Sequence, residues 1–486
     1  MGKVAIESYT IKFEQIEVGI AIERTDEDFV PHYIAEVTNV SKPTLLILDN
    51  IREEFINKSK LSTQKAVAGI KDRFKNEIRS ILNEYFPDLD NHKIELLVNY
   101  VIEQNLGLGH VEVLLRDPAL EEIVINNSSD PVWVYHRKHG WCKTNITIPD
   151  EDRIRHYSTL IGRDINKEIT LLSPLMDAHL KTGDRVNATL YPISTKGNTI
   201  TIRKFAADPW TITDFLNSGT IDADAAALIW LGIEHELSIL IAGGTGSGKT
   251  SMLNVIANFL PPNHRVISIE DTRELTLPNM LHWVPLETRL PNPEGKGEVS
   301  MLDLLVNSLR MRPDRIVVGE IRRKKEAEVL FEAMHTGHSV YATIHANTAP
   351  ETVARLTNPP IDVPKLMLAS LSMIIVQNRD RKTGKRRTFQ VAQVTSAGDA
   401  QVIMQYDIKT DKLKKVKEPN VLYETLGLYT GMSKEQVNKN LAEKKKILAW
   451  IVQKKIKNVH DIGLVVSLYY QGKSISDFEQ ALRGRV

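Results

Sequence analysis

The stretch LSILIAGGTGSGKTSMLNVIANFL, residues 237–260, organises the rest of this chain. Its first six residues form a short apolar run with the length and the Ile/Leu content of a buried strand, and apolar residues at helical spacing fill its second half. Between the two lies the spacing G-x-x-x-x-G-K-[ST], occupied by Gly243, Gly248, Lys249 and Thr250. This spacing, between a strand and a helix, is typical of a loop that binds the phosphates of a nucleotide.

The glycines of this loop need a physical reason, because glycine in regular structure costs roughly 0.5–1 kcal/mol relative to alanine. A bound phosphate supplies one, since glycines let backbone N–H groups approach its oxygens at the positive end of the following helix. Lys249 is then expected to reach the β/γ-phosphates, and the Thr250 hydroxyl to hold Mg²⁺. The alternative is a glycine-rich loop that contains a lysine by chance. The predicted nucleotide-binding residues are Gly243, Gly244, Thr245, Gly246, Ser247, Gly248, Lys249, Thr250 and Ser251.

Length and composition limit the class of protein. The 486 residues predict roughly two to four domains. With 62 Lys and Arg against 61 Asp and Glu, the net charge is +1, so the whole molecule lacks the charge of a nucleic-acid binder. The single cysteine, Cys142, excludes an intrachain disulfide and a multi-cysteine zinc site. No signal peptide and no run of ~18 apolar residues is evident, which predicts a cytosolic protein with at most peripheral membrane contact.

The chain on either side of the loop divides into further regions. Residues 16–22 alternate like a strand, the apolar stretch 44–48 is assigned to the same β-like segment, and a helical period begins near Thr63. Further strands are predicted near 120–126 and 199–205. The predicted segments are 1–105 (an N-terminal α+β region), 106–207 (a second α+β domain), 208–222 (a linker), 223–400 (the nucleotide-binding α/β core) and 401–486 (a mainly helical extension).

Two predicted strands of the core end in acidic residues. Residues 265–269 lead into Glu270, and residues 316–318 lead into Gly319 and Glu320. Because parallel strands end at one edge of a sheet, these carboxylates are expected beside the phosphate loop. Gly319 stands where such ATPase strands usually carry an aspartate, which leaves Glu320 for water activation or for an indirect Mg²⁺ contact. A purely structural role at the strand end is the alternative.

Histidines flank a fourth predicted strand, residues 339–343. His335 and His338 precede it, and His345 follows it. Their spacing matches no common zinc signature, and no cysteine is near. A neutral imidazole at a strand end can instead bind a phosphate or a carboxylate and report whether the γ-phosphate is present. Capping or core packing is the alternative for each histidine.

Four motifs in register carry a family resemblance. They are GGTGSGKT (243–250), VISIEDTREL (266–275), RPDRIVVGEIR (312–322) and TGHSVYATIHAN (336–347). In this order they resemble the Walker A, Asp box, atypical Walker B and His box of the type II/type IV secretion ATPases, the motors of pilus assembly, archaellum assembly and secretion. A weaker likeness extends upstream to residue 107. The lack of a paired-cysteine zinc module and the wording EDTREL are more similar to the archaeal branch.

The resemblance implies a fold, ligands and residue roles. The fold is an α/β, RecA-like P-loop ATPase domain with a mostly parallel sheet, preceded by an α+β N-terminal region, and the ligands are ATP and Mg²⁺. Glu270 and Glu320 become unranked candidates for activating water. Arg185 and Arg203 would reach the γ-phosphate from the preceding domain, whose closure would gate hydrolysis. The implied catalytic residues are Lys249, Glu270, Glu320, His338, His345, Arg185 and Arg203, and the implied Mg²⁺ contacts are Thr250 and Glu320.

The resemblance also implies a homo-hexamer that drives pilin-like filament subunits through a polytopic membrane platform protein, from the cytoplasmic face of the membrane. Near the C-terminus, apolar residues between 447 and 456 lie among lysines. This stripe predicts either a helix on an anionic membrane or, as favoured here, a helix packed on the subunit core. Two other functions remain open: a DNA-transfer motor, against which the charge balance argues, and a nucleotide-switched scaffold with little turnover.

Overall fold

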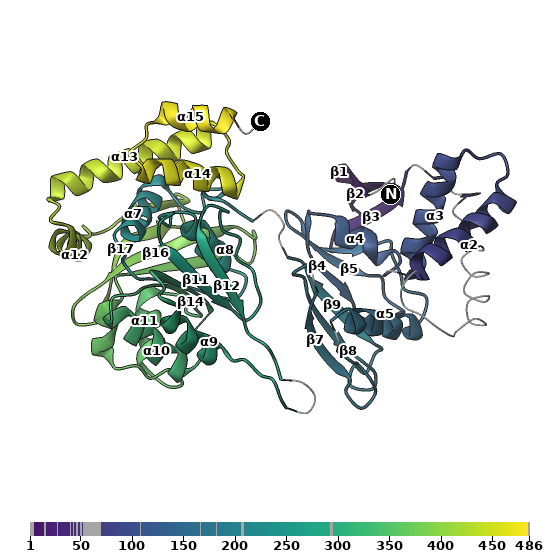
Figure 1. The fold of residues 1–486 in the computed structure, drawn as a ribbon, viewed down its shortest axis with the longest axis horizontal. Coiled ribbons are helices and arrows are strands. Elements are labelled where there is room, and N and C mark those ends of the chain that lie inside the picture. Colours follow the sequence, from purple (N-terminus) through teal and green to yellow (C-terminus); the bar gives the residue numbers. More distant parts are fainter. Residues whose placement is uncertain are drawn as a thin grey trace. The chain divides into compact units, whose positions relative to one another are not determined.

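The computed structural model describes residues 4–484, except 14–15, 27, 39, 42, 45–46, 49–50, 52–69, 107, 166, 181, 206–208 and 292–294. The chain divides into two compact units, Met1–Ala207 and Asp208–Val486 (Figure 1). Each unit has its own nine-stranded sheet.

The sheet of the first unit is mostly antiparallel and runs in the order β1-β2-β3-β6-β5-β4-β9-β8-β7. The parallel pairing of β3 with β6 joins residues 4–37 to residues 120–203, so both parts contribute to one sheet and one core. The strands are β1 (Val4–Phe13), β2 (Ile16–Arg24), β3 (His32–Val37), β4 (Leu120–Ile125), β5 (Trp133–His136), β6 (Gly140–Thr144), β7 (Leu175–His179), β8 (Arg185–Thr189) and β9 (Thr199–Arg203).

The helices of this unit are α2 (Ile70–Tyr85), α3 (Asn91–Leu106), α4 (Val111–Arg116) and α5 (Glu151–Asp164). The β-like assignment of residues 44–48 is wrong, because the described residues of this stretch are helical. Ser41 explains the difference: its hydroxyl oxygen accepts the Thr44 N–H at 3.3 Å, as a helix-capping serine does. The helix start predicted near Thr63 lies outside the described residues.

The sheet of the second unit runs in the order β12-β11-β13-β14-β10-β15-β16-β17-β18. The strands from β12 to β15 are parallel, and the order β11-β13-β14-β10-β15 is that of a RecA-like core. The last two strands, which begin at Ala400, continue the sheet past the end of the core that the sequence analysis predicts at residue 400. The strands are β10 (Ile239–Gly243), β11 (Arg265–Glu270), β12 (His282–Glu287), β13 (Arg315–Glu320), β14 (Ser339–Ile344), β15 (Met373–Arg379), β16 (Arg386–Val394), β17 (Ala400–Asp407) and β18 (Lys412–Lys415).

Helices cover both faces of this sheet, which is why its central strands are apolar throughout. Every residue of β10 is buried: Ile239 and Ile241 face one core, and Leu240 and Ala242 face the other. The first core includes α6 (Ile212–Asn217), α7 (Ala223–Glu234) and α8 (Lys249–Ala257), and the second includes α9 (Met301–Ser308), α10 (Lys324–His335) and α11 (Ala349–Thr357).

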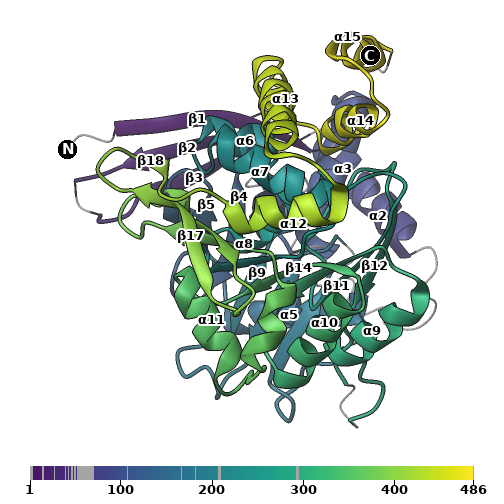
Figure 2. The same ribbon diagram turned by 90° about the vertical axis from the view of Figure 1, so that its left-hand side faces the viewer.

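The C-terminal helices belong to the same unit, and α13 packs on α7 (Figure 2). The apolar stripe of α13 is core: Ile447, Leu448 and Ile451 are buried. This confirms the packing interpretation favoured by the sequence. None of the helices in the described ranges is long and apolar enough to cross a membrane. The helices are α12 (Asn420–Thr430), α13 (Lys434–Gln453), α14 (Val459–Tyr470) and α15 (Ile475–Arg483).

Candidate active site

The phosphate loop connects the end of β10 to the start of α8. Gly246 and Gly248 have φ angles of +69° and +94°, in the left-handed region that residues with a Cβ rarely adopt. Ser247 closes the loop, since its Oγ donates to the Gly244 carbonyl at 2.8 Å. Thr250 lies in the first turn of α8, together with Ser251. The loop therefore presents the positive end of a helix to its surroundings, as a phosphate site requires.

Lys249 folds back over this loop. Its side chain is largely buried, at 9 % exposure. The Nζ atom donates to the Gly244 carbonyl at 3.0 Å and lies 3.3 Å from Nδ1 of His345. The lysine thus links the phosphate loop to the end of β14, at the place where the motif predicts contact with the outer phosphates.

His345 extends this link to Glu320. Its Nε2 lies 2.7 Å from Oε1 of Glu320. Burial, followed by the charge of Lys249, lowers the pKa of His345, so the ring is neutral at pH 7. A neutral ring whose Nδ1 accepts from Lys249 carries its proton on Nε2, the atom that lies against Glu320. Within the described residues, Oε1 of Glu320 accepts no hydrogen bond, so this contact is one of proximity. Lys249, His345 and Glu320 therefore form a continuous polar chain.

A β-bulge sets the position of Glu320. The register between β13 and β14 shifts between Val318 and Glu320, and the Gly319 carbonyl accepts from Oγ1 of Thr343 at 2.6 Å. Arg322 donates to Oε2 of Glu320 at 2.5 Å and also to Asp271 at the end of β11. Burial opposes ionisation of Glu320, but the hydrogen bond and the charge of Arg322, together with the nearby charge of Lys249, lower its pKa. Glu320 is therefore an ionised carboxylate.

Glu270 lies at the end of β11, the strand next to β13, and its pKa is shifted in the opposite direction from that of Glu320. It is 3 % exposed, and its Oε1 accepts the backbone N–H groups of Glu274 at 2.9 Å and Leu275 at 3.1 Å. Burial raises its pKa to about 7. Within the described parts of the chain, its Oε2 has no hydrogen-bond partner. A carboxyl with this pKa can take up and release a proton near neutral pH.

The structure does not bring His338 to this site. Its Nδ1 lies 3.2 Å from the Ala333 carbonyl and 3.2 Å from Oγ1 of Thr336, next to the amino end of β14. The six residues of β14 separate it from His345, which corresponds to about 20 Å of strand. The alternative interpretation of His338 as a structural residue therefore fits its contacts better.

Arg185 and Arg203 belong to the first unit. They face each other in the register of β8 and β9, and the Arg185 guanidinium donates to both carboxylate oxygens of Asp177, at 3.0 and 2.6 Å. Their predicted contact with a γ-phosphate stays a prediction.

The residues present fit Mg²⁺ bound mainly through a nucleotide. In the residues that the structure describes, no three His, Cys, Asp or Glu side chains converge as a metal cage. Mg²⁺ commonly keeps several waters and takes one or two protein oxygens besides phosphate oxygens. The Thr250 hydroxyl and the Glu320 carboxylate are oxygen donors of this kind.

Comparison with known proteins places this site in a family. The family model described as "Type II/IV secretion system protein" matches residues 106–457. The chain belongs to this family. A Methanocaldococcus jannaschii relative, "Uncharacterized protein MJ0781", is 38 % identical over 341 residues, which are 68 % of this chain and 46 % of that protein. The chain spans about half the length of the first curated relatives that it matches.

Two further proteins are similar to the chain. A Mycobacterium tuberculosis protein, Rv3659c, whose name refers to conjugal transfer, is 32 % identical over 320 residues, or 62 % of this chain and 89 % of that protein. The crystal structure of the Legionella pneumophila ATPase DotB is 20 % identical, covers 76 % of this chain and 93 % of its own, and superposes with a TM-score of 0.44.

One part of this family member's site escaped the sequence analysis. Arg386, the first residue of β16, donates from Nε to the Gly246 carbonyl of the phosphate loop at 3.0 Å. Arg379, the last residue of β15, also lies against Gly246. The available signal was the basic run RDRKTGKRR at 379–387, but no motif spacing connects it with the loop.

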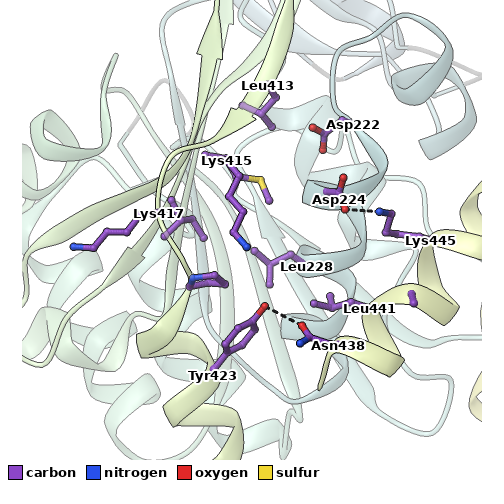
Figure 3. A pocket seen from close by; sticks show the side chains of 14 residues that line it. Asp222, Asp224, Leu228, Leu413, Lys415, Lys417, Tyr423, Asn438, Leu441 and Lys445 are labelled. Carbon is purple, nitrogen blue, oxygen red and sulfur yellow. Dashed lines mark hydrogen bonds and ion pairs between the residues drawn. The ribbon is translucent and has the colours of Figure 1, made fainter. Parts of the chain in front are cut away.

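A separate cavity of about 480 Å³ lies between α7, α13 and the β17–β18 hairpin (Figure 3). Lys445 and Asp224 pair across it at 2.6 Å, and the Tyr423 hydroxyl donates to Oδ1 of Asn438 at 3.4 Å. The carboxylate of Asp222 caps α7 by accepting the Ala225 N–H at 2.7 Å. Two further lysines, Lys415 and Lys417, also line the cavity.

Proposed function

We propose that the chain hydrolyses ATP with Mg²⁺ and works as a motor subunit of a type II/IV secretion or type IV pilus-like machine. The observation that carries this proposal is the chain of contacts Lys249–His345–Glu320 beside a phosphate loop. Family membership supports it independently.

The two carboxyl groups suggest a division of work in hydrolysis. Water attacks the γ-phosphate in line with the leaving oxygen, and Lys249 offsets the charge that develops there. Glu270, with a pKa near 7, is suited to accept the proton of that water. Glu320 stays ionised and, with Arg322 and His345, orients the groups around the phosphate. Bound Mg²⁺, held by Thr250 and Glu320, would supply further charge stabilisation.

His345 is suited to sense the γ-phosphate. Lys249 now donates toward its Nδ1, and a phosphate that attracts the ammonium would remove this donor. The imidazole would then be free to donate or accept elsewhere while it remains beside Glu320. In this way ATP and ADP would leave the end of β14 in different hydrogen-bonding states.

The machine itself is argued from the family. We propose a homo-hexamer that acts at the cytoplasmic face of a membrane on a polytopic platform protein, and through it on filament subunits, in the manner of the archaellum and pilus branch. Arg185 and Arg203 would approach ATP when the first unit closes on the second. Charge-assisted arginine contacts of this kind can be worth about 10³-fold or more in rate.

Steady-state ATP hydrolysis by the purified protein tests the proposal. Wild type should turn over ATP only with Mg²⁺, and Lys249→Ala should lose at least about 10²-fold in rate. Lys439→Ala, a charge-matched change on the exposed side of α13, should behave as wild type. Magnesium-dependent nucleotide binding without turnover would instead favour the switched scaffold.

A DNA-transfer motor is the second candidate, favoured by the conjugal-transfer relative. Titration of the same assay with anionic vesicles, single-stranded DNA and duplex DNA separates the two. Stimulation by vesicles and indifference to DNA supports the membrane-platform motor. Stimulation by DNA alone contradicts it.

A further inference from the structure

We propose that Arg379 and Arg386 form the second wall of the nucleotide site, holding the phosphate loop and the phosphate nearer the ribose. Arg386 acts as a positioning residue through the loop backbone, and Arg379 binds the nucleotide directly. This inference rests on the proposed function, because it concerns the same site.

The topology places both arginines at the level of the loop. Strand β15 runs parallel to β10 with Gly243 paired to Gln377, so Arg379 lies two residues beyond the point where the loop begins. The chain then turns and returns as β16, in which Arg386 pairs with Arg379 across the antiparallel ladder. The hairpin therefore presents two guanidinium groups side by side at the carboxyl edge of the sheet.

Both side chains reach the glycines of the loop. Nε of Arg386 donates to the Gly246 carbonyl at 3.0 Å, and its Cδ lies 3.5 Å from the place a Cβ on Gly248 would take. Nη1 of Arg379 lies 3.1 Å from the corresponding place on Gly246. Glycine at position 246 thus serves the close approach of Arg379 as well as the positive φ angle, whereas at Gly248 the contact with Arg386 is an ordinary van der Waals one.

The charge of the hairpin favours an anion. Residues 379–387 contain six basic side chains and one acidic side chain, Asp380. The Asp380 carboxylate is used within the turn, where it accepts the Lys382 N–H at 2.8 Å and the Thr383 hydroxyl at 2.8 Å. Asp411 holds Arg387 with two bonds, at 2.7 and 3.0 Å, and also pairs with Lys385 at 3.4 Å.

The position of the hairpin indicates which end of the nucleotide it meets. The reactive side of the loop is marked by His345 and Glu320, which follow β14 and β13. Strand β15 lies on the other side of β10 in the sheet. A phosphate chain that spans the loop therefore has its outer end toward β14 and its inner end toward β15. Both ATP and ADP possess that inner phosphate, so the arginines should hold them equally.

The test compares affinity with turnover. Fluorescence titration with a methylanthraniloyl derivative of ADP gives the Kd, and steady-state ATP hydrolysis gives KM and kcat. Arg379→Ala should raise the Kd for ADP and the KM for ATP by about tenfold or more, the usual loss for a hydrogen bond to a charged group, with kcat within about twofold. Arg386→Ala should show the same pattern.

Two further variants separate a specific contact from general charge. Arg381→Ala removes a positive charge from the exposed turn of the same hairpin and should leave Kd and KM unchanged. Arg386→Lys keeps the charge but lacks the Nε that reaches Gly246, so it should recover only part of the affinity. It also replaces the alanine variant if that variant does not fold.

Three results would overturn the inference: unchanged Kd in both alanine variants, an equal loss in Arg381→Ala, or a fall of kcat without a change in Kd. The ADP titration does not depend on hydrolysis. Wild-type protein that binds ADP through these arginines but never turns over ATP would contradict the proposed function and leave this inference standing.

Discussion

Strands β13 and β14 carry a polar cluster at each end, and the two clusters differ in burial. At the amino ends, Arg315 is fully buried and donates to Oγ of Ser339 at 2.7 Å, to the Tyr341 hydroxyl at 3.0 Å and to Nδ1 of His264 at 2.9 Å. These bonds join two strands and the loop before β11. A buried network of this kind is costly to disturb, because each group that loses its partner remains away from water.

At the carboxyl ends, the cluster of Glu320, Arg322 and His345 is more open. The exposed fractions of these side chains are 22 %, 55 % and 40 %. Their partners can be exchanged for a ligand or for water at little cost, since partly solvated ion pairs contribute only about 0–1 kcal/mol. The same two strands therefore combine a fixed end, which holds the sheet, with an adaptable end, which is suited to chemistry.

Removing the centre of the fixed end should have the largest effect. Arg315→Ala is expected to lower the free energy of unfolding by about 3–5 kcal/mol, because it leaves a cavity and deprives buried hydroxyl groups of their partner. Urea denaturation measures this loss, with Lys325→Ala on the exposed side of α10 as the control. Turnover per folded molecule should not change. If Arg315→Ala lowered the free energy of unfolding by less than about 1 kcal/mol, the amino ends of the strands would be no more important to stability than the carboxyl ends.

The adaptable end should show the reverse pattern. Glu320→Gln is expected to slow ATP turnover by on the order of 10²–10³-fold, because the carboxylate that orders the phosphate surroundings is lost. Its effect on the free energy of unfolding should stay within about 1 kcal/mol. Parallel measurements of kcat, nucleotide Kd and urea stability check this. If Glu320→Gln hydrolysed ATP as fast as wild type, Glu270 would be the only one of the two carboxyl groups needed for catalysis.

Glu270 provides a pH-dependent test. Because burial raises its pKa from 4.5 to about 7, its contribution to stability is complete below pH 4.5 and is lost as the pH rises through 7. At pH 8.5 the buried carboxylate should cost on the order of 1–3 kcal/mol. Glu270→Gln should therefore be more stable than wild type at pH 8.5, with the advantage shrinking toward pH 5.

The same variant tests the role of Glu270 as a base. Wild-type turnover should increase as the pH rises through about 7, and Glu270→Gln should be slow at every pH. Equal stability of the two proteins at pH 8.5 would show that Glu270 is not a buried acid. A pH profile that survives the substitution would assign the proton to another group.

The smallest effects should separate the two histidines that flank β14, His338 and His345. His345→Ala is expected to reduce turnover by about tenfold or more, since it interrupts the chain from Lys249 to Glu320. His338→Ala should remain within about 0.5 kcal/mol in stability and twofold in turnover. Paired ATPase and thermal-unfolding measurements are sufficient. Equal losses of turnover in both variants would place His338 at a catalytic site that the described contacts do not show.

Local sequence was sufficient for most of the second unit's sheet. The spacing of the glycines and Lys249 predicted the loop, and apolar runs ending in Glu270 and Glu320 predicted two parallel strands of the same sheet. These features succeed because strand, loop and helix are adjacent in the chain. The motif TGHSVYATIHAN contains both His338 and His345, but the strand β14 lies between them, so the two histidines are at opposite ends of that strand.

Strand pairing between distant parts of the chain and the environment of single side chains could not be predicted from short sequence patterns. The pairing of β3 with β6, which joins the first strands to those after residue 120, depends on contacts about a hundred residues apart. Arg386 and Gly246 are 140 residues apart in the sequence, and their contact depends on the register of the β15–β16 hairpin. The pKa of Glu270 follows from its burial, which no spacing of residues encodes. Residues 44–48 were predicted to be β-like from their apolar side chains, although Ser41 just before them is a helix-capping residue. Here the prediction gave the apolar run more weight than the local capping signal.

The C-terminal helices are attached to α6 and α7, the first helices of the second unit, and this attachment has a mechanical consequence. The chain enters the second unit just before α6, where Thr213 donates to the Ile456 carbonyl and Lys457 pairs with Asp214 at 3.0 Å. On α7, Glu234 pairs with the buried Lys444 of α13. A pulling force transmitted along the backbone from the first unit would therefore load the C-terminal helices before it reached β10. These contacts tie the entry point of the second unit to its last helices without using any residue of the phosphate loop.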